Sequence, residues 1–188
     1  MKPKRILSLC DYSGNWSRPY REAGYEVIQV DIQLTGKDIR LLECMDDVYG
    51  ILAAPPCTCF AASGARWKRS DADMIDALSI VDACIRLAFV HKPHFWVLEN
   101  PIGKLVRYLG KPRFYFNPCD YGDPYTKRTC LWGDFVAPTV ETLGGDWSVP
   151  PVDGSKMHKL YGGKSLKTKN ARSATPMGFA KAFFQVNR

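Results

Sequence analysis

The sequence has no long apolar run, and the start of the chain carries no secretory signal. Residues 83–90 are its most apolar stretch, but Asp82 and Arg86 interrupt the pattern, which excludes a membrane span. The first residues run directly into a strand-like segment, residues 6–9, without an apolar signal region or a small-residue cleavage site. We therefore expect a cytoplasmic protein with no membrane partner.

The sequence contains cysteines, but their number and spacing do not indicate a disulfide framework. The seven cysteines are odd in number and scattered, which favours reduced thiols over disulfides. Cys57 and Cys59, joined by Cys119 or a histidine, would be the nearest approach to a zinc site. Their spacing matches none of the usual pairs of zinc ligands, so no metal is expected.

Positive charge is in modest excess, with 26 Lys and Arg against 19 Asp and Glu, a formal charge of +7. One basic cluster comprises Arg66, Lys68 and Arg69. The other comprises Lys156, His158, Lys159, Lys164, Lys167, Lys169 and Arg172. Basic segments of this kind suit a contact with a nucleic-acid backbone, although a solvated surface loop explains them equally well.

The first part of the chain has the plan of a nucleotide-cofactor half-site. Residues 5–10 form an expected strand, residues 11–17 a turn, and residues 18–23 a helix that begins after Ser17 and ends at Gly24. Residues 25–30 are a second strand, which ends at Asp31. Gly14 alone remains of the usual glycines, and Asp31 follows it by roughly the expected twenty residues.

Two later strands end near prolines and place reactive or polar side chains at their carboxyl ends. Residues 48–54 stop at Pro55 and Pro56, which fix the backbone ahead of Cys57. Residues 95–98 lead to Glu99 and Asn100, before Pro101. Polar groups at the carboxyl ends of strands in an open α/β sheet are where chemistry is usually placed.

The remaining pattern completes an α/β chain. The periodicity of residues 71–90 indicates a long core helix. Residues 102–109 suggest a short helix, residues 113–116 and 130–133 two strands, and the residues after Pro176 a final helix. The predicted fold is a doubly wound, mostly parallel sheet in a single domain over residues 1–188, with an irregular basic segment at 134–172.

In this order the motifs resemble the S-adenosylmethionine-dependent DNA cytosine-5 methyltransferases, especially the short forms carried by bacteriophages. The resemblance runs from about residue 5 to residue 185. Its specific parts are Pro55-Pro56-Cys57 and Glu99-Asn100-Pro101, supported by residues 7–17, Lys127-Arg128 and residues 173–180. It implies a Rossmann-like class I methyltransferase fold.

The resemblance also implies roles for residues. Cys57 would attack C6 of cytosine, Glu99 would hydrogen-bond the ring, Arg128 would hold O2, and Asn100 would position the Cys57 loop. The base would be flipped out of the duplex. The implied S-adenosyl-L-methionine site comprises Asp11, Tyr12, Ser13, Gly14, Asn15, Trp16, Ser17, Asp31, Ile32, Asp38, Ile39, Pro56 and Ser173. The implied nucleic-acid contacts are Arg66, Lys68, Arg69, Lys127, Lys164, Lys167 and Lys169.

Departures from the family pattern leave alternatives open. Tyr12 replaces the usual first glycine of the cofactor loop, Pro101 a valine, and Ser173 an asparagine. Residues 134–172 are too few for an independent recognition domain, which indicates short or relaxed specificity, or an accessory subunit. The substrate could be RNA or single-stranded DNA, or the chain could be a catalytically weak nucleic-acid-binding protein. A phage-encoded form would act in the host cytoplasm.

Overall fold

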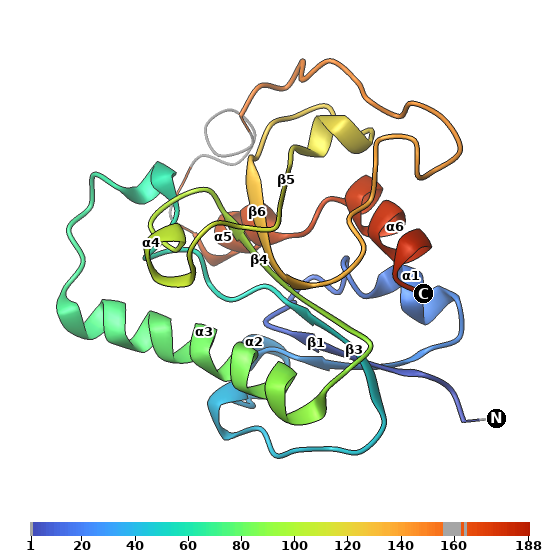
Figure 1. Cartoon of the computed structure of the whole chain (residues 1–188). Coiled ribbons are helices and arrows are strands. Elements are labelled where there is room, and N and C mark those ends of the chain that lie inside the picture. The colour runs from blue at the N-terminus through green and yellow to red at the C-terminus, as the bar shows by residue number, and fades with distance from the viewer. Residues whose placement is uncertain (1, 156–162, 164) are drawn as a thin grey trace.

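A computed structural model describes residues 2–155, 163 and 165–188. Its centre is a six-stranded sheet in the order β2-β1-β3-β4-β6-β5. The strands are β1 (Arg5–Leu9), β2 (Glu26–Val30), β3 (Val48–Ala53), β4 (Phe95–Pro101), β5 (Phe114–Phe116) and β6 (Thr129–Asp134). The first four strands are parallel, whereas β6 runs antiparallel to both β4 and β5 (Figure 1).

Helices cover both faces of this sheet. They are α1 (Arg18–Glu22), α2 (Ile32–Thr35), α3 (Asp71–His91), α4 (Val106–Leu109), α5 (Leu166–Ser173) and α6 (Met177–Val186). The described residues also form three 3-10 turns: η1 (Ile39–Leu41), η2 (Ala62–Gly64) and η3 (Pro118–Tyr121). The long helix α3 lies on one side of the sheet, and α1 with α6 lies on the other (Figure 1). The predicted α/β class, with a doubly wound and mostly parallel sheet, is confirmed.

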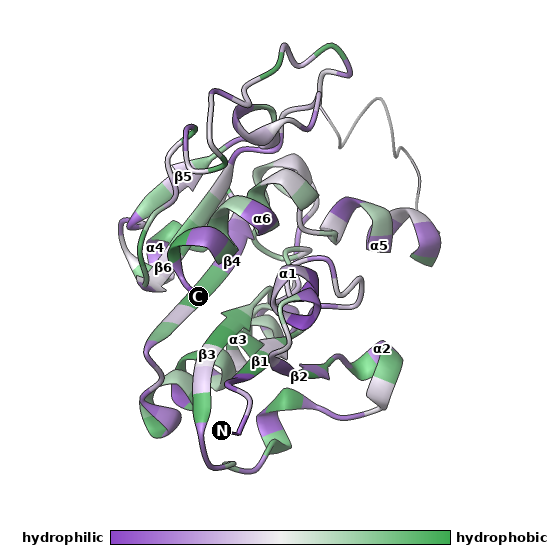
Figure 2. Ribbon diagram, turned by 90° about the vertical axis from the view of Figure 1, so that its right-hand side faces the viewer, coloured by the Kyte–Doolittle hydropathy of each residue, from purple (hydrophilic) through white to green (hydrophobic). Residues whose placement is uncertain are grey.

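The alternation of side chains along each strand produces two cores. Leu7, Ile51 and Leu98 face α3, while their neighbours Leu52 and Val97 face α1 and α6. Figure 2 shows the central strands as largely hydrophobic, with α2 and α5 on one side of the molecule. A sheet buried on both faces explains why the inner strands read as continuous apolar runs.

The start of α3 follows from its sequence. The Ser70 side chain accepts a hydrogen bond from the Asp73 backbone N–H, and the Asp73 carboxylate accepts one from the Ser70 N–H. This reciprocal capping box satisfies two backbone donors that would otherwise lack partners. The helix therefore begins at Asp71, as predicted.

Two of the sequence predictions need correction. Segment 134–172 was expected to be irregular, but its last part forms α5, which Ser165 caps by accepting from the Thr168 N–H. The helix expected over residues 102–109 is limited to α4, because Ile102 and Gly103 bond to other strands and loops. None of the described helices is long and apolar enough to cross a membrane.

Phe183 offers a test of the core on the α1 and α6 side. It is fully buried, with its ring near those of Trp16, Phe95 and Phe179. We expect Phe183→Ala to lower the free energy of unfolding by about 3–5 kcal/mol, measured by urea denaturation. Phe89→Ala is the control: Phe89 on α3 is 72% exposed, and its loss should cost less than about 0.5 kcal/mol. Equal effects of the two substitutions would contradict the assignment of this core.

Candidate active site

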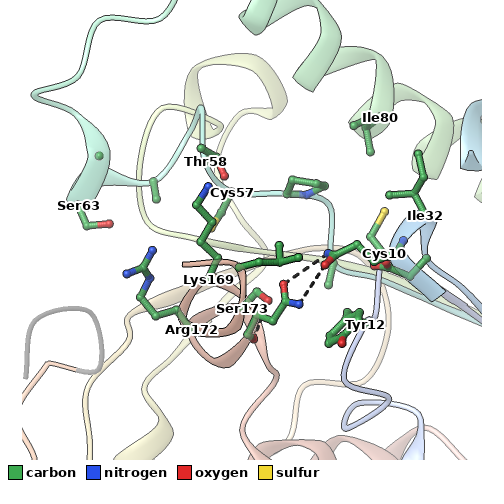
Figure 3. A pocket seen from close by; sticks show the side chains of 18 of the residues that line it. Cys10, Tyr12, Ile32, Cys57, Thr58, Ser63, Ile80, Lys169, Arg172 and Ser173 are labelled. Carbon is green, nitrogen blue, oxygen red and sulfur yellow. Dashed lines mark hydrogen bonds between the residues drawn. The ribbon is translucent and has the colours of Figure 1, made fainter. Parts of the chain in front are cut away.

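A cavity of about 900 Å³ opens at the carboxyl ends of β1, β2 and β3. Strand order reverses at β1, which has β2 on one side and β3 on the other, and ligands of open α/β sheets bind at such a point. Residues from all three strand ends line the cavity, including Cys10, Asp31 and Cys57. In Figure 3, side chains of α3 and α5, such as Ile80 and Lys169, enclose it further.

The turn that carries Cys57 is held by backbone hydrogen bonds. The Cys57 carbonyl accepts from the N–H groups of Phe60 and Ala61, at 3.0 and 2.8 Å. Ala61 also bridges Gly103, where an added Cβ would lie 2.0 Å from the Phe60 carbonyl oxygen. Because that contact leaves no room for a side chain, only glycine fits at this position. The half-buried Cys57 is therefore mounted on a rigid turn.

A buried side-chain bond ties this turn to β4. The Asn100 Nδ2 donates to the Pro55 carbonyl oxygen at 2.9 Å, and Asn100 is 1% exposed. The Asn100 Oδ1 has no hydrogen-bond partner among the described residues. A buried acceptor without a partner requires an explanation, such as a functional role.

Glu99 and Lys127 form a buried ion pair next to Cys57. The Lys127 Nζ lies 3.5 Å from the Glu99 Oε1, and the two side chains are 3% and 4% exposed. Glu99 lies opposite Leu131 in the β4–β6 register, and alternation back along β6 brings Lys127 to the same face. The strand pairing thus explains why these two charges meet.

The charges around Cys57 oppose one another. Burial raises the pKa of the Cys57 thiol and the Glu99 carboxylate adds to this, whereas Lys127 and Arg172 lower the pKa. The balance is a raised pKa, so the thiol form prevails in this conformation. For Cys57 to act as a nucleophile, its pKa would have to fall. The effect of the cations would then have to exceed the combined effect of burial and Glu99.

Arg128, which was predicted to hold O2 of the cytosine, is exposed. Its guanidinium lies 5.2 Å from the centre of the Tyr115 ring. The alternation that turns Lys127 inward turns Arg128 away from Glu99. Both line a second cavity of about 180 Å³, together with Ser63, Pro101 and Asn117. Lys127, predicted as a nucleic-acid contact, is the cation beside Glu99.

The opposite end of the large cavity has a carboxylate between apolar walls. Asp31 is 7% exposed and accepts from the Gln33 backbone N–H at 2.8 Å. Burial raises its pKa, partly offset by the Gln33 bond, and the charge of Asp11 raises it further. Ile32 and Tyr12 nearby are 62% and 40% exposed, which is unusual for apolar side chains lining a cavity.

Much of the predicted cofactor turn is committed to internal bonds. The Asp11 carboxylate accepts from Ser8, Ser13, Ser17 and the Gly14 N–H, and the Trp16 side chain is fully buried against Phe183. Asn15 donates to the Thr175 carbonyl. Of residues 11–17, Tyr12 lines the cavity, and the other six do not. Pro56, Asp38, Ile39 and Ser173, which were predicted for the cofactor site, line this cavity.

Helix α5 supplies a wall that the sequence reading missed. Leu166, Lys169, Asn170 and Ser173 follow helical spacing and face the cavity, as does Arg172. In Figure 3, Lys169 and Arg172 extend from α5 toward Thr58 and Ser63. The amides of Asn170 and Gln33 bond reciprocally, at 3.0 and 3.4 Å, which joins α5 to α2 across the cavity.

The predicted nucleic-acid residues fall in three places. Arg66, Lys68 and Arg69 belong to the loop after η2 and line the cavity, with Arg69 donating to the Thr58 carbonyl. Lys169 lines it from α5, while Lys167 is exposed on that helix without lining it. Lys164 lies outside the described residues. Within the described residues, no group of three or more His, Cys, Asp or Glu side chains could hold a metal ion.

No protein-family model matches the chain, and no curated protein does. Among solved structures, it is similar to a prophage-encoded E. coli protein, described as a candidate DNA modification methyltransferase, with a TM-score of 0.49 and 17% identity. The similarity covers 86% of this chain and 56% of that one, so this chain spans little more than half its length. A similarity of this size gives no information on function.

Asp31 allows the electrostatics of the site to be tested. Because burial raises its pKa, the charged form weakens the folded state at neutral pH, and this penalty disappears as the pH falls through the raised pKa. Asp31→Asn keeps an oxygen for the Gln33 N–H but removes the charge. We expect its melting temperature at neutral pH to exceed that of the wild type by about 2–4 °C, and the difference to vanish in acid.

Asp38→Asn is the matched comparison. The pKa of Asp38 is lowered by its bonds to Arg40, so its charged form strengthens the fold and its loss should lower the melting temperature at neutral pH. Thermal denaturation between pH 4 and 8 measures both differences. A decrease for Asp31→Asn that does not change with pH would refute the assignment.

Proposed function

We propose that this chain transfers a methyl group from S-adenosyl-L-methionine to C5 of a cytosine in DNA, by way of a covalent Cys57 adduct at C6. The observation that supports the proposal best is the meeting of Cys57, Glu99 and Lys127 beside a cavity that has a carboxylate between apolar walls at its far end. A nucleophile, an acid–base group and a cofactor-sized space are thereby adjacent.

The far end of the cavity suits the adenosine part of this cofactor. The buried Asp31 carboxylate has one described hydrogen-bond donor, Gln33, and retains capacity to accept from ribose hydroxyls. The exposed apolar surfaces of Ile32 and Tyr12 fit the two faces of a purine, and Asp38 and Ile39 lie at the same end. The cofactor, when bound, supplies an electrophilic methyl group on a sulfonium.

Cys57 acts on the pyrimidine ring. Its thiolate adds to C6, which moves electron density to C5 and makes that carbon nucleophilic. After C5 has been methylated and has lost its proton, elimination of the Cys57 sulfur restores the aromatic ring. The rigid turn fixed by Asn100 and Gly103 holds the sulfur in place for both steps.

Glu99 serves the opposite edge of the ring. A carboxyl group there can hydrogen-bond N3 and the exocyclic amine, the atoms where negative charge develops when sulfur adds to C6. Lys127 lies beside it, 3.5 Å from the Glu99 Oε1. Neither residue lines the large cavity, so the base would have to enter between them and Cys57.

DNA is the proposed substrate because cations surround the entrance. Arg66 and Lys68 are exposed on the loop after η2, and Lys169 extends from α5. A duplex shields C5 and C6, so the target cytosine has to leave the stack. Segment 134–172 is short, which favours relaxed sequence specificity or an accessory recognition subunit.

Single-stranded DNA or RNA is the second candidate substrate. Trp67 is 51% exposed in the basic loop, and the Arg66 guanidinium lies 5.1 Å from its ring centre. Exposed aromatic side chains among cations form stacking platforms for unpaired bases. A catalytically weak nucleic-acid-binding protein is the third, favoured by the raised pKa of Cys57.

Covalent trapping distinguishes these candidates. An oligonucleotide with 5-fluorocytosine at the target position cannot lose the C5 substituent, so the adduct should persist through denaturation and be visible by mass spectrometry. We expect Cys57→Ser to form no adduct and to reduce methyl transfer by about 10³-fold or more. Its affinity for S-adenosyl-L-methionine, measured by calorimetry, should be nearly unchanged.

Cys59→Ser is the matched control and should keep the adduct, because Cys59 lies two residues away and bonds the Asp73 carbonyl. Single-stranded, double-stranded and RNA forms of the oligonucleotide are compared in parallel. Methylation of another base, or an adduct that survives Cys57→Ser, would exclude the proposed chemistry. Binding of DNA without binding of the cofactor would favour the third candidate.

The basic loop makes a separate prediction. Replacing Arg66 and Lys68 by Gln should weaken DNA binding irrespective of sequence and reduce the slope of log affinity against log salt by about 2, since each phosphate contact contributes about 0.9. Lys181→Gln on α6 is the control, an exposed lysine remote from the loop. Fluorescence anisotropy over a salt series measures the slope, and an unchanged slope would remove the loop from the interface.

A further inference from the structure

The Glu99–Lys127 pair is not built as a stabilising ion pair should be. Both side chains are almost fully buried, and charges removed from water are repaid only by excellent geometry and further hydrogen bonds. Here the Nζ to Oε1 distance is 3.5 Å, and the Glu99 Oε1 has no hydrogen-bond partner among the described residues. The pair therefore calls for an explanation other than stability.

The positive charge of Lys127 acts on the Cys57 thiol as well as on the Glu99 carboxylate. Among the charged groups, Lys127 has the strongest effect on the pKa of the Cys57 thiol, ahead of Glu99 and Arg172. The charged groups that face Cys57 come from three elements: Glu99 from β4, Lys127 from the residues before β6, and Arg172 from α5. Arg172 is half-buried and donates to the Gly163 carbonyl, so Lys127 is the cation enclosed with the sulfur.

We propose that Lys127 is a positioning residue for the reaction, whose ammonium group moves its pairing from the Glu99 carboxylate to the Cys57 thiolate. This inference rests on the proposed function and names a role for a residue that the sequence placed at the nucleic-acid surface. Lys127 acts through Cys57 and Glu99 and does not itself react.

The proton and charge balance closes within these three groups. The S–H bond of Cys57 breaks and an O–H bond forms on Glu99, which leaves one thiolate, one carboxylic acid and one ammonium in place of thiol, carboxylate and ammonium. The sulfur then bonds to C6, the ring electrons shift toward N3, and N3 takes the proton from Glu99. Glu99 is a carboxylate again and pairs with Lys127, so the buried net charge never changes.

Alkylation of Cys57 tests this role without cofactor or DNA. The full-length chain is treated with iodoacetamide from pH 6 to 10, and the Cys57 peptide is followed by mass spectrometry. We expect Lys127→Met to move the midpoint of the rate against pH upward by a unit or more, which means about tenfold slower alkylation below the midpoint. Glu99→Gln should move it downward, and Lys127→Arg should leave it near the wild type.

These opposite shifts separate an electrostatic role from a structural one. A loosened turn would expose Cys57 and accelerate alkylation in both single variants. Lys181→Met on α6 is the matched control and should not move the midpoint. Should Lys127→Met fail to fold, because it leaves Glu99 buried without a partner, the double variant Glu99→Gln/Lys127→Met is compared with Glu99→Gln, and its midpoint should lie higher.

The proposal is overturned if Lys127→Met leaves the midpoint unchanged, or if it shifts in the same direction as Glu99→Gln. It is likewise overturned if the double variant and Glu99→Gln have the same midpoint. The proposed function fails separately, through the absence of a 5-fluorocytosine adduct in the wild type. The two failures are distinguishable because alkylation requires neither a pyrimidine nor a methyl donor.

Discussion

The hydrogen bond from Asn100 to the Pro55 carbonyl is the interaction on which the rest of the site depends. Pro55 and Pro56 cannot donate to the sheet, so β3 ends there and the Pro55 carbonyl needs a partner from elsewhere. Asn100 supplies it from the end of β4. Side chains alternate along a strand, so placing Asn100 toward the Cys57 turn places Glu99 on the other face, beside Lys127. One bond thus determines how the sulfur, the carboxyl group and the cation are arranged.

The same site concentrates groups that weaken the folded protein. Asp31 is a carboxylate in a place that favours its neutral form. Glu99 and Lys127 are buried charges, and the Glu99 Oε1 has no hydrogen-bond partner among the described residues. A structure selected for stability alone would replace such groups by packed apolar side chains. The apolar cores on both sheet faces, around Leu98 and Phe183, supply the stability that these groups remove.

The sequence predicted those parts of the fold and site that depend on local chemistry. Proline-stopped strands and the acid after β2 are read from neighbouring residues, and they placed Cys57, Glu99 and Asp31 at or near strand ends. The sequence did not predict the positions of side chains that depend on contacts between distant segments. The inward position of Lys127 requires the antiparallel register of β4 and β6, and the burial of Trp16 requires α6. The α5 wall could have been found: Leu166, Lys169, Asn170 and Ser173 have helical spacing after the Ser165 cap.

Helix α5 places the end of segment 134–172 against the large cavity. Its end does not extend outward as a reading module would; it folds back and bonds α2 through Gln33 and Asn170. Lys169 and Arg172 consequently line the cavity, and the positive charge of Arg172 lowers the pKa of Cys57. Under the proposed function, a cation that also lowers the pKa of Cys57 is poorly placed to discriminate between base sequences. Under the proposed function, the end of this segment would enclose the reacting groups, and sequence reading would fall to the exposed loop at Arg66–Arg69 or to a partner.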